Sequence, residues 1–184
     1  MYTLDYYHAS VPVSEYLDKY VDVPAFLEAC KACPNYGRIW SCPPYDFQVS
    51  DYWKKYQSLK LLAVKITFEE ESTARTYSQE ELNRILNDTL FAQKQHLSAL
   101  LFEEEKKFPG SISLSAGSCQ SCKKGCTRPE GTPCISPKPL RYSLESLGAN
   151  VRLTIEKLMG VELDWMEEGK LPSHFVLVSG LLLP

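Results

Sequence analysis

The sequence predicts a mixed α+β or α/β fold in which a small sheet of about three or more strands packs against a long helix. Apolar strand-like runs occupy residues 61–68, 112–115 and 175–178, and a leucine pattern of helical period covers 79–107. Hydrophobic residues make up 44% of the 184 positions, enough to build a core. We expect residues 1–184 to form a single domain that carries two cysteine-rich segments, 30–44 and 117–142.

Short elements are predicted in the first third of the chain. Asp22 precedes Val23-Pro24 and has the character of an N-cap, so a short helix should begin there and end at Cys30. Ser50 and Asp51 predict a second short helix that continues to Tyr56. Residues 61–68 then predict a strand that is buried at its start and alternates towards its end.

The long helix is the clearest predicted element. Residues 78–81 form a capping box, and the run ends at Phe108-Pro109-Gly110. The apolar side chains in between should pack in the core, and His96 should be a structural histidine. The apolar positions are Leu82, Ile85, Leu86, Leu90, Leu97, Leu100 and Leu101.

The last part of the chain alternates strands and short helices. Residues 112–115 alternate and predict a strand that leads into the second cysteine-rich segment. Residues 143–148 predict one or two helical turns closed by glycine. Asn150 predicts the cap of a helix that ends at Met159, with Gly160 after it. Residues 175–178 predict a third strand that can continue to Leu183.

The charge balance excludes several function classes. The chain has 20 Lys and Arg against 23 Asp and Glu, a net charge of −3, so no basic field is available for nucleic acid or an anionic membrane. The N-terminus lacks a cationic head and an apolar run, and the longest apolar stretch, 175–183, is far shorter than the roughly 20 residues that span a bilayer. We therefore expect a soluble cytoplasmic protein with no nucleic-acid or membrane partner.

Seven cysteines carry the strongest functional signal. Their odd number and the lack of a secretory signal argue against a disulfide scaffold. They are also clustered, whereas core cysteines would be scattered among apolar positions. Metal binding explains this pattern best. The two groups are Cys30, Cys33 and Cys42, and Cys119, Cys122, Cys126 and Cys134.

The second group places four thiolates in a short loop rich in glycine and proline. Such a loop can wrap a [4Fe–4S] cluster, in which each iron takes one thiolate. A tetrahedral zinc site with four thiolates is the alternative. Zinc sites usually combine two short knuckles, however, whereas the gaps after Cys122 in this group are three and seven residues long. Lys123, Lys124, Arg128, Lys138 and Arg141 surround this group against Glu130 alone. We favour compensation of cluster charge for Arg128 and Arg141.

The first group supplies only three thiolates, Cys30, Cys33 and Cys42. A cluster held by three cysteines leaves one iron for another ligand or for a substrate, and an open iron can act as a Lewis acid. Alternatively, this group is a zinc knuckle completed from elsewhere, or Cys30 and Cys33 join Cys119 and Cys122 in one zinc site. The candidate fourth ligands are His8, Asp46, His174, water or a substrate.

The order of these motifs resembles a known family. The first motif is Cys30-x2-Cys33-x2-Tyr36-Gly37-x2-Trp40-x-Cys42-Pro43-Pro44. After it come the four-cysteine group and then Arg141-Tyr142-Ser143-Leu144-Glu145-x2-Gly148. This pattern is similar to a family of predicted metal-binding proteins of unknown function that is typical of anaerobic bacteria and archaea. The resemblance covers nearly the whole chain and implies two iron–sulfur sites with the seven cysteines as ligands. It implies no particular reaction.

These observations predict a metal-binding protein that holds two [4Fe–4S] clusters and has a redox role. The four-thiolate cluster would relay electrons, and the three-thiolate site would face a small-molecule substrate or a redox partner protein. A non-enzymatic electron carrier and a zinc-binding structural or interaction module are the alternatives. No catalytic acid or base stands out, because the glutamate runs at 69–71 and 103–105 have the pattern of solvated surface.

Overall fold

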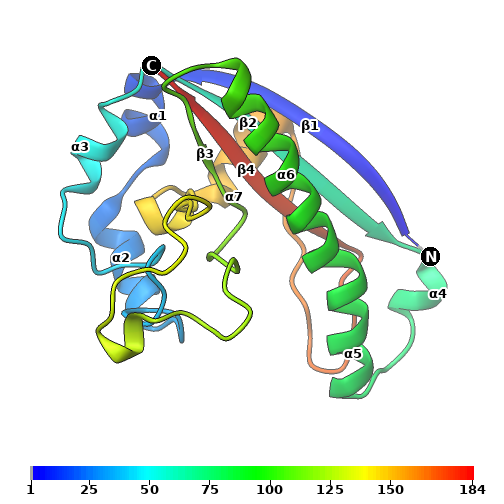
Figure 1. Ribbon diagram of the computed structural model, residues 1–184. Helices are drawn as coiled ribbons and strands as arrows, with labels where there is room; N and C mark the ends of the chain where they lie inside the picture. Colours follow the sequence, from blue (N-terminus) through cyan, green and yellow to red (C-terminus); the bar gives the residue numbers. More distant parts are fainter. Residues whose placement is uncertain (1) are drawn as a thin grey trace.

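A four-stranded antiparallel sheet forms the scaffold of the protein (Figure 1). The computed structural model describes residues 2–184. The strands lie in the order β1–β2–β4–β3. Their bounds are Tyr2–Pro12 for β1, Ser58–Phe68 for β2, Ile112–Leu114 for β3 and His174–Leu183 for β4. The structure confirms the predicted mixed α+β class, and the sheet makes it α+β because each neighbouring pair of strands runs antiparallel.

Strand β2 lies between β1 and β4 and is buried on both faces. Its side chains alternate, so that Leu59 and Leu61 join one apolar cluster and Val64 and Ile66 join the other. Strand β1 pairs with β2 along its whole length, from Tyr2 opposite Phe68 to Pro12 opposite Ser58. The sequence analysis did not predict β1, because an edge strand with one exposed side lacks a continuous apolar run.

The long helix packs on one face of the sheet, as predicted. It consists of α5 (Gln79–Leu86), the π-helical turn η1 (Asn87–Phe91) and α6 (Ala92–Lys107). The capping box of Ser78 and Glu81 begins it. Leu82 and Leu97 pack against Val64 and Ile66 of β2. Leu100 is an exception to the predicted stripe, since it is exposed, and His96 is exposed rather than packed.

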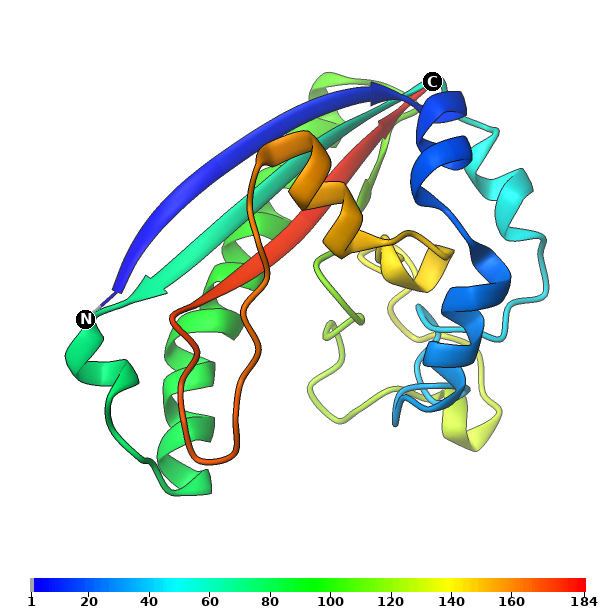
Figure 2. The same cartoon turned by 180° about the vertical axis from the view of Figure 1, so that it is seen from behind.

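The other face of the sheet is covered by the helices α1 (Val13–Tyr20) and α7 (Val151–Met159) (Figure 2). Tyr16 of α1 hydrogen-bonds Thr154 of α7 at 2.9 Å, and Ile155 is fully buried between them and the sheet. Asn150 caps α7 and Gly160 ends it, as predicted. The remaining helical elements are α2 (Val23–Lys31), α3 (Val49–Trp53), α4 (Glu70–Thr73), η2 (Arg128–Glu130) and η3 (Glu145–Leu147).

Two boundaries differ from the sequence predictions. Helix α3 begins at Val49 and ends at Trp53, so it starts and stops earlier than the predicted helix that reached Tyr56. Strand β2 begins three residues before Leu61, because Ser58 and Leu59 already pair with β1 and β4. The organisation of residues 1–184 as a single domain stays a prediction. Among residues 2–184, no helix combines the length and the apolar character that crossing a bilayer requires.

Candidate metal centre

The first cysteine loop, residues 30–44, follows helix α2. The Asp22 side chain caps this helix by accepting a hydrogen bond from the Ala25 amide at 3.1 Å, which confirms the predicted N-cap. Cys30 therefore lies in the last turn of α2. The loop then folds back on itself, since the Cys33 amide donates to the Cys30 carbonyl and the Gly37 amide donates to the Pro43 carbonyl. These turns bring three cysteines that are up to twelve positions apart into one small region.

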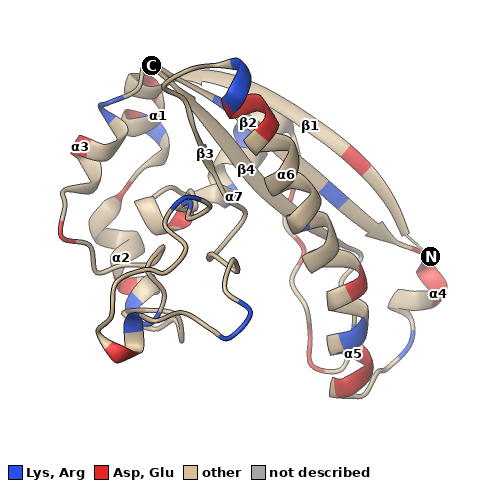
Figure 3. Cartoon of the chain, viewed as in Figure 1, with Lys and Arg blue, Asp and Glu red and all other residues tan. Residues whose placement is uncertain are grey.

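The second cysteine loop, residues 117–142, connects β3 to η3. Its turns are local: the Gly125 amide donates to the Cys122 carbonyl, and η2 ends at Gly131. Figure 3 shows basic residues along this loop, with acidic colour confined to η2. Each of its residues keeps part of its surface exposed to solvent, so the loop lies at the surface of the protein.

The two cysteine loops contact each other directly and lie side by side in Figures 1 and 2. The Trp40 amide donates to the Cys126 sulfur at 3.4 Å, and the Cys119 amide donates to the Ser41 hydroxyl at 2.9 Å. Arg128 donates to the Ile39 carbonyl at 2.9 Å and also to the carbonyls of Cys42 and Pro44. The sequence analysis expected Arg128 to offset cluster charge. The structure adds a role in joining the loops.

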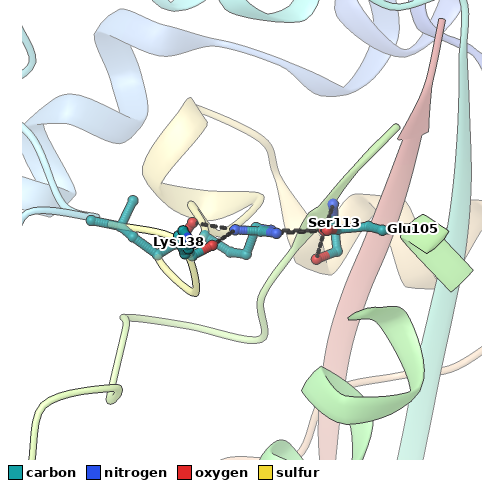
Figure 4. Close-up of polar contacts among 5 residues, drawn as sticks. Glu105, Ser113 and Lys138 are labelled. Carbon is teal, nitrogen blue, oxygen red and sulfur yellow. Dashed lines mark hydrogen bonds and ion pairs between the residues drawn. The ribbon is translucent and has the colours of Figure 1, made fainter. Parts of the chain in front are cut away.

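Arg141 fixes the far end of the second cysteine loop to the scaffold (Figure 4). Its guanidinium donates to both oxygens of Glu105 on α6, at 2.7 and 2.6 Å, and to the Lys138 carbonyl at 2.7 Å. Glu105 also accepts two hydrogen bonds from Ser113 of β3 at 2.6 Å. Both charged side chains are largely buried, with exposures of 14% and 16%. The charge of Arg141 is therefore matched by Glu105, where the sequence analysis expected a cluster.

The three cysteines of the first group line one pocket of about 220 Å³. A water molecule takes up about 30 Å³, so the space exceeds what a single metal ion requires. Burial raises the pKa of Cys42 to about 11, and burial together with the neighbouring Cys33 raises the pKa of Cys30. These thiols therefore hold their protons at neutral pH until a metal cation displaces them.

The second group is spread over a larger area. Cys119 lines a pocket of about 270 Å³ beside α6, and Cys134 lines another of about 310 Å³ beside Trp40. All seven cysteines are free thiols. Within residues 2–184, no group of three or more His, Cys, Asp or Glu side chains is arranged to hold a metal ion as it stands. The loops would have to draw their sulfurs together around a metal, as is usual when binding and local folding are coupled.

The structure does not bring the predicted fourth ligands to the first group. His8 lies on the exposed side of edge strand β1, and Asp46 is exposed beyond the Pro43-Pro44 corner. His174 is engaged elsewhere, since its ring nitrogens contact the Ser173 hydroxyl and the Glu162 carbonyl at 2.8 Å. None of the three belongs to the residues that line the 220 Å³ pocket.

Two charged residues that had no predicted role lie near this pocket. Glu145 of η3 lines it with the three cysteines, and burial raises the pKa of its carboxyl. Lys94 of α6 is buried with 9% exposure, and burial lowers the pKa of its amine. The position of Glu145 in the element that follows the second cysteine group was the available signal. The signal for Lys94 was that it interrupts an otherwise apolar helix face, where a lysine is rarely buried without a partner.

Gly148 lets η3 approach helix α2 closely. Its φ is +79°, and a Cβ atom there would lie 2.8 Å from the Cα of Val23. The approach is fixed by hydrogen bonds, since the Asp22 amide donates to the Gly148 carbonyl at 2.9 Å and the Asn150 amide donates to the Tyr20 carbonyl at 2.7 Å. The glycine thus places η3, which carries Glu145, against the helix that carries Cys30.

The donor set fits a thiophilic metal. Thiolate sulfur is the preferred ligand of zinc and of iron–sulfur clusters, and seven free thiols in two adjoining loops supply it. Glu145 Oε2, buried without a hydrogen-bond partner, adds an oxygen donor at the first group. Seven thiols placed in this way on an α+β scaffold are characteristic of a metalloprotein.

The comparison with known families agrees with that class. The chain belongs to the family described as predicted metal-binding protein (DUF2284), which matches residues 18–183. This confirms the resemblance drawn from the cysteine motifs. No curated protein and no solved structure matches the chain.

Proposed function

We propose that this protein is a cytoplasmic iron–sulfur protein with a redox role and two metal sites. The observation that carries the proposal is the placement of all seven free cysteines in two loops that contact each other through Trp40, Ser41 and Arg128. A reducing compartment keeps such thiols available for metal. One-electron transfer is the chemistry that [4Fe–4S] clusters would supply here.

The second group, Cys119, Cys122, Cys126 and Cys134, is proposed to hold one cluster that relays electrons. Its glycine turns and its exposed surface support this, because a relay must lie close to the partner that delivers or accepts the electron. The Trp40 amide that donates to the Cys126 sulfur would stabilise negative charge on that sulfur and so tune the reduction potential.

The first group, Cys30, Cys33 and Cys42, is proposed to hold the second metal centre. The shared pocket of about 220 Å³ supports a centre larger than one ion. With three cysteines, the fourth position is available to a different ligand or to a substrate. The partner of the protein is then a small molecule that binds at this pocket or a redox protein that docks on the cysteine loops.

The experiment is anaerobic expression of the full chain followed by analysis of iron, acid-labile sulfide and zinc. We expect about eight irons and eight sulfides per chain, from two [4Fe–4S] clusters. Cys42→Ser and Cys134→Ser should each remove one cluster, which gives about four irons in either variant. About one or two zinc ions per chain without sulfide would overturn the redox proposal and favour a zinc-stabilised interaction module.

A further inference from the structure

The carboxylate of Glu145 is placed among the cysteines of the first group. It lines the same pocket as Cys30, Cys33 and Cys42. Its Oε2 atom is buried and has no hydrogen-bond partner. A buried carboxylate oxygen without a donor costs free energy, so its retention needs an explanation.

The element that carries Glu145 is held firmly. Ser143 and Ser146 exchange hydrogen bonds, with the Ser143 amide donating to the Ser146 hydroxyl at 3.0 Å and the Ser146 amide donating to the Ser143 hydroxyl at 3.2 Å. Gly148 presses the end of the same turn against Val23. The position of Glu145 is therefore set by the fold, as is required of a metal ligand that is preorganised before the metal binds.

A buried positive charge faces the same place from the long helix. Lys94 donates to the Ser118 carbonyl, a neutral acceptor, and it lines one pocket together with Glu145. A buried ammonium group is costly unless negative charge lies nearby. Ser118 also lines the pocket of the three cysteines, so Lys94 is one residue layer away from it.

We propose that Glu145 is the fourth protein ligand of the metal centre at Cys30, Cys33 and Cys42, and that Lys94 is its buried counter-charge. This inference rests on the proposed function, because it requires metal at the first group, but it holds for a cluster and for zinc alike. Three thiolates and a carboxylate around a doubly positive core leave two negative charges, and Lys94 offsets one of them. A fourth position taken by protein favours electron transfer at this site over an open iron.

The test is a titration of the reduced, metal-free full chain with Co²⁺ under nitrogen. Binding is measured by the thiolate-to-cobalt charge-transfer absorption. The wild type should bind in two phases, one for each cysteine group. Glu145→Gln should weaken one phase by roughly 10- to 100-fold, the range seen when groups that support a metal site are lost. Glu28→Gln is the matched control, since Glu28 is exposed on the helix that carries Cys30 and pairs with Lys31; it should bind as the wild type does.

A second pair of variants tests for a gain of thiolate-to-cobalt absorption. Glu145→Cys should add thiolate-to-cobalt absorption to the weakened phase, because a fourth sulfur would reach the metal, whereas Glu28→Cys should add none. Unchanged binding in Glu145→Gln together with no added absorption in Glu145→Cys would overturn the inference and leave the proposed function intact. A wild type without any thiolate-to-cobalt absorption would overturn both.

The wild-type structure decides the matter if either variant fails to fold. In crystals of the cobalt-loaded protein, a Glu145 oxygen about 2.0–2.2 Å from the metal at the first group would support the inference. A Glu145 carboxylate outside bonding distance of that metal would overturn it.

Discussion

The sheet with its helices and the pair of cysteine loops are held by different forces. In the sheet, Leu59, Ala63 and Ile66 of β2 are fully buried between two layers of helices. In the second cysteine loop every residue from 117 to 142 keeps some exposed surface, and the loop is fastened by hydrogen bonds at its two ends and, through Cys126 and Arg128, in its middle. Because hydrophobic burial dominates stability, the sheet has a source of stability that needs no metal, whereas the loops depend on point attachments and, in our account, on metal.

Removal of metal should produce the largest difference between the two regions. Chelation or exposure to oxygen should release residues 117–142 to solvent while the long helix, Gln79–Lys107, stays folded. Hydrogen exchange followed by mass spectrometry checks this in the anaerobically purified protein before and after chelation. Equal protection of both regions in the metal-free protein would show that the loop does not depend on metal.

Loss of the Arg141 attachment should have the next largest effect. Arg141→Met leaves Glu105 charged and partly buried without its partner, which costs about 3 kcal/mol for a buried pair. Urea unfolding of the full chain measures the loss. The control is Arg84→Met, which removes an exposed pair with Glu80 and should leave the unfolding midpoint unchanged. Equal effects of the two variants would refute the anchoring role of Arg141.

The same attachment predicts how stability depends on pH. Burial alone would raise the pKa of Glu105, but hydrogen bonds from Arg141 and Ser113 outweigh it and lower this pKa below the usual value of 4.5. The folded state therefore binds a proton at Glu105 less readily than the unfolded state does. Its stabilising contribution is complete above pH 4.5 and is lost as the pH falls through the lowered pKa. Glu105→Gln should flatten this part of the acid unfolding curve, and an unchanged curve would contradict the assignment.

The contact between η3 and α2 should have a smaller effect on stability and a visible one on metal binding. Gly148→Ala forces a Cβ against the Val23 backbone at positive φ and should cost about 2–3 kcal/mol. Gly131→Ala is the control, because Gly131 also has a positive φ but has open space around it, so it should cost only about 1 kcal/mol. Thermal unfolding measures both. Only Gly148→Ala should also weaken metal binding at the first group.

Local chemistry made much of the scaffold predictable. Asp22, Ser78 and Asn150 each cap the helix that the sequence assigned to them, because a short polar side chain before an apolar run satisfies free amides of the first turn. Strand β1 escaped prediction because an edge strand is defined by its partner β2, which lies about fifty residues away along the chain. The exposed Leu100 shows that helical spacing predicts a stripe but not how wide the stripe is.

The cysteines of the candidate site could be predicted from the sequence, but its buried charged residues could not. Cysteine spacing alone indicated two groups, and the three residues of the first group line one pocket. Glu145 and Lys94 could not be found in the same way, because the place of Glu145 after the second cysteine group and of Lys94 on an apolar helix face are weaker signals than cysteine spacing. Glu145 reaches the pocket because η3 docks on α2, and Lys94 lies beside Glu145 because the long helix packs across the sheet. Such long-range placement follows from the fold and not from any short motif.

Anomalous X-ray diffraction at the iron and zinc edges from anaerobically grown crystals tests the central claim most directly. The account predicts iron peaks at two positions, one bounded by the sulfurs of Cys30, Cys33 and Cys42 and one by the four sulfurs of the second loop. Sulfur positions that stay apart with no metal peak at either loop, or that bond in pairs in oxygen-free protein, would contradict it.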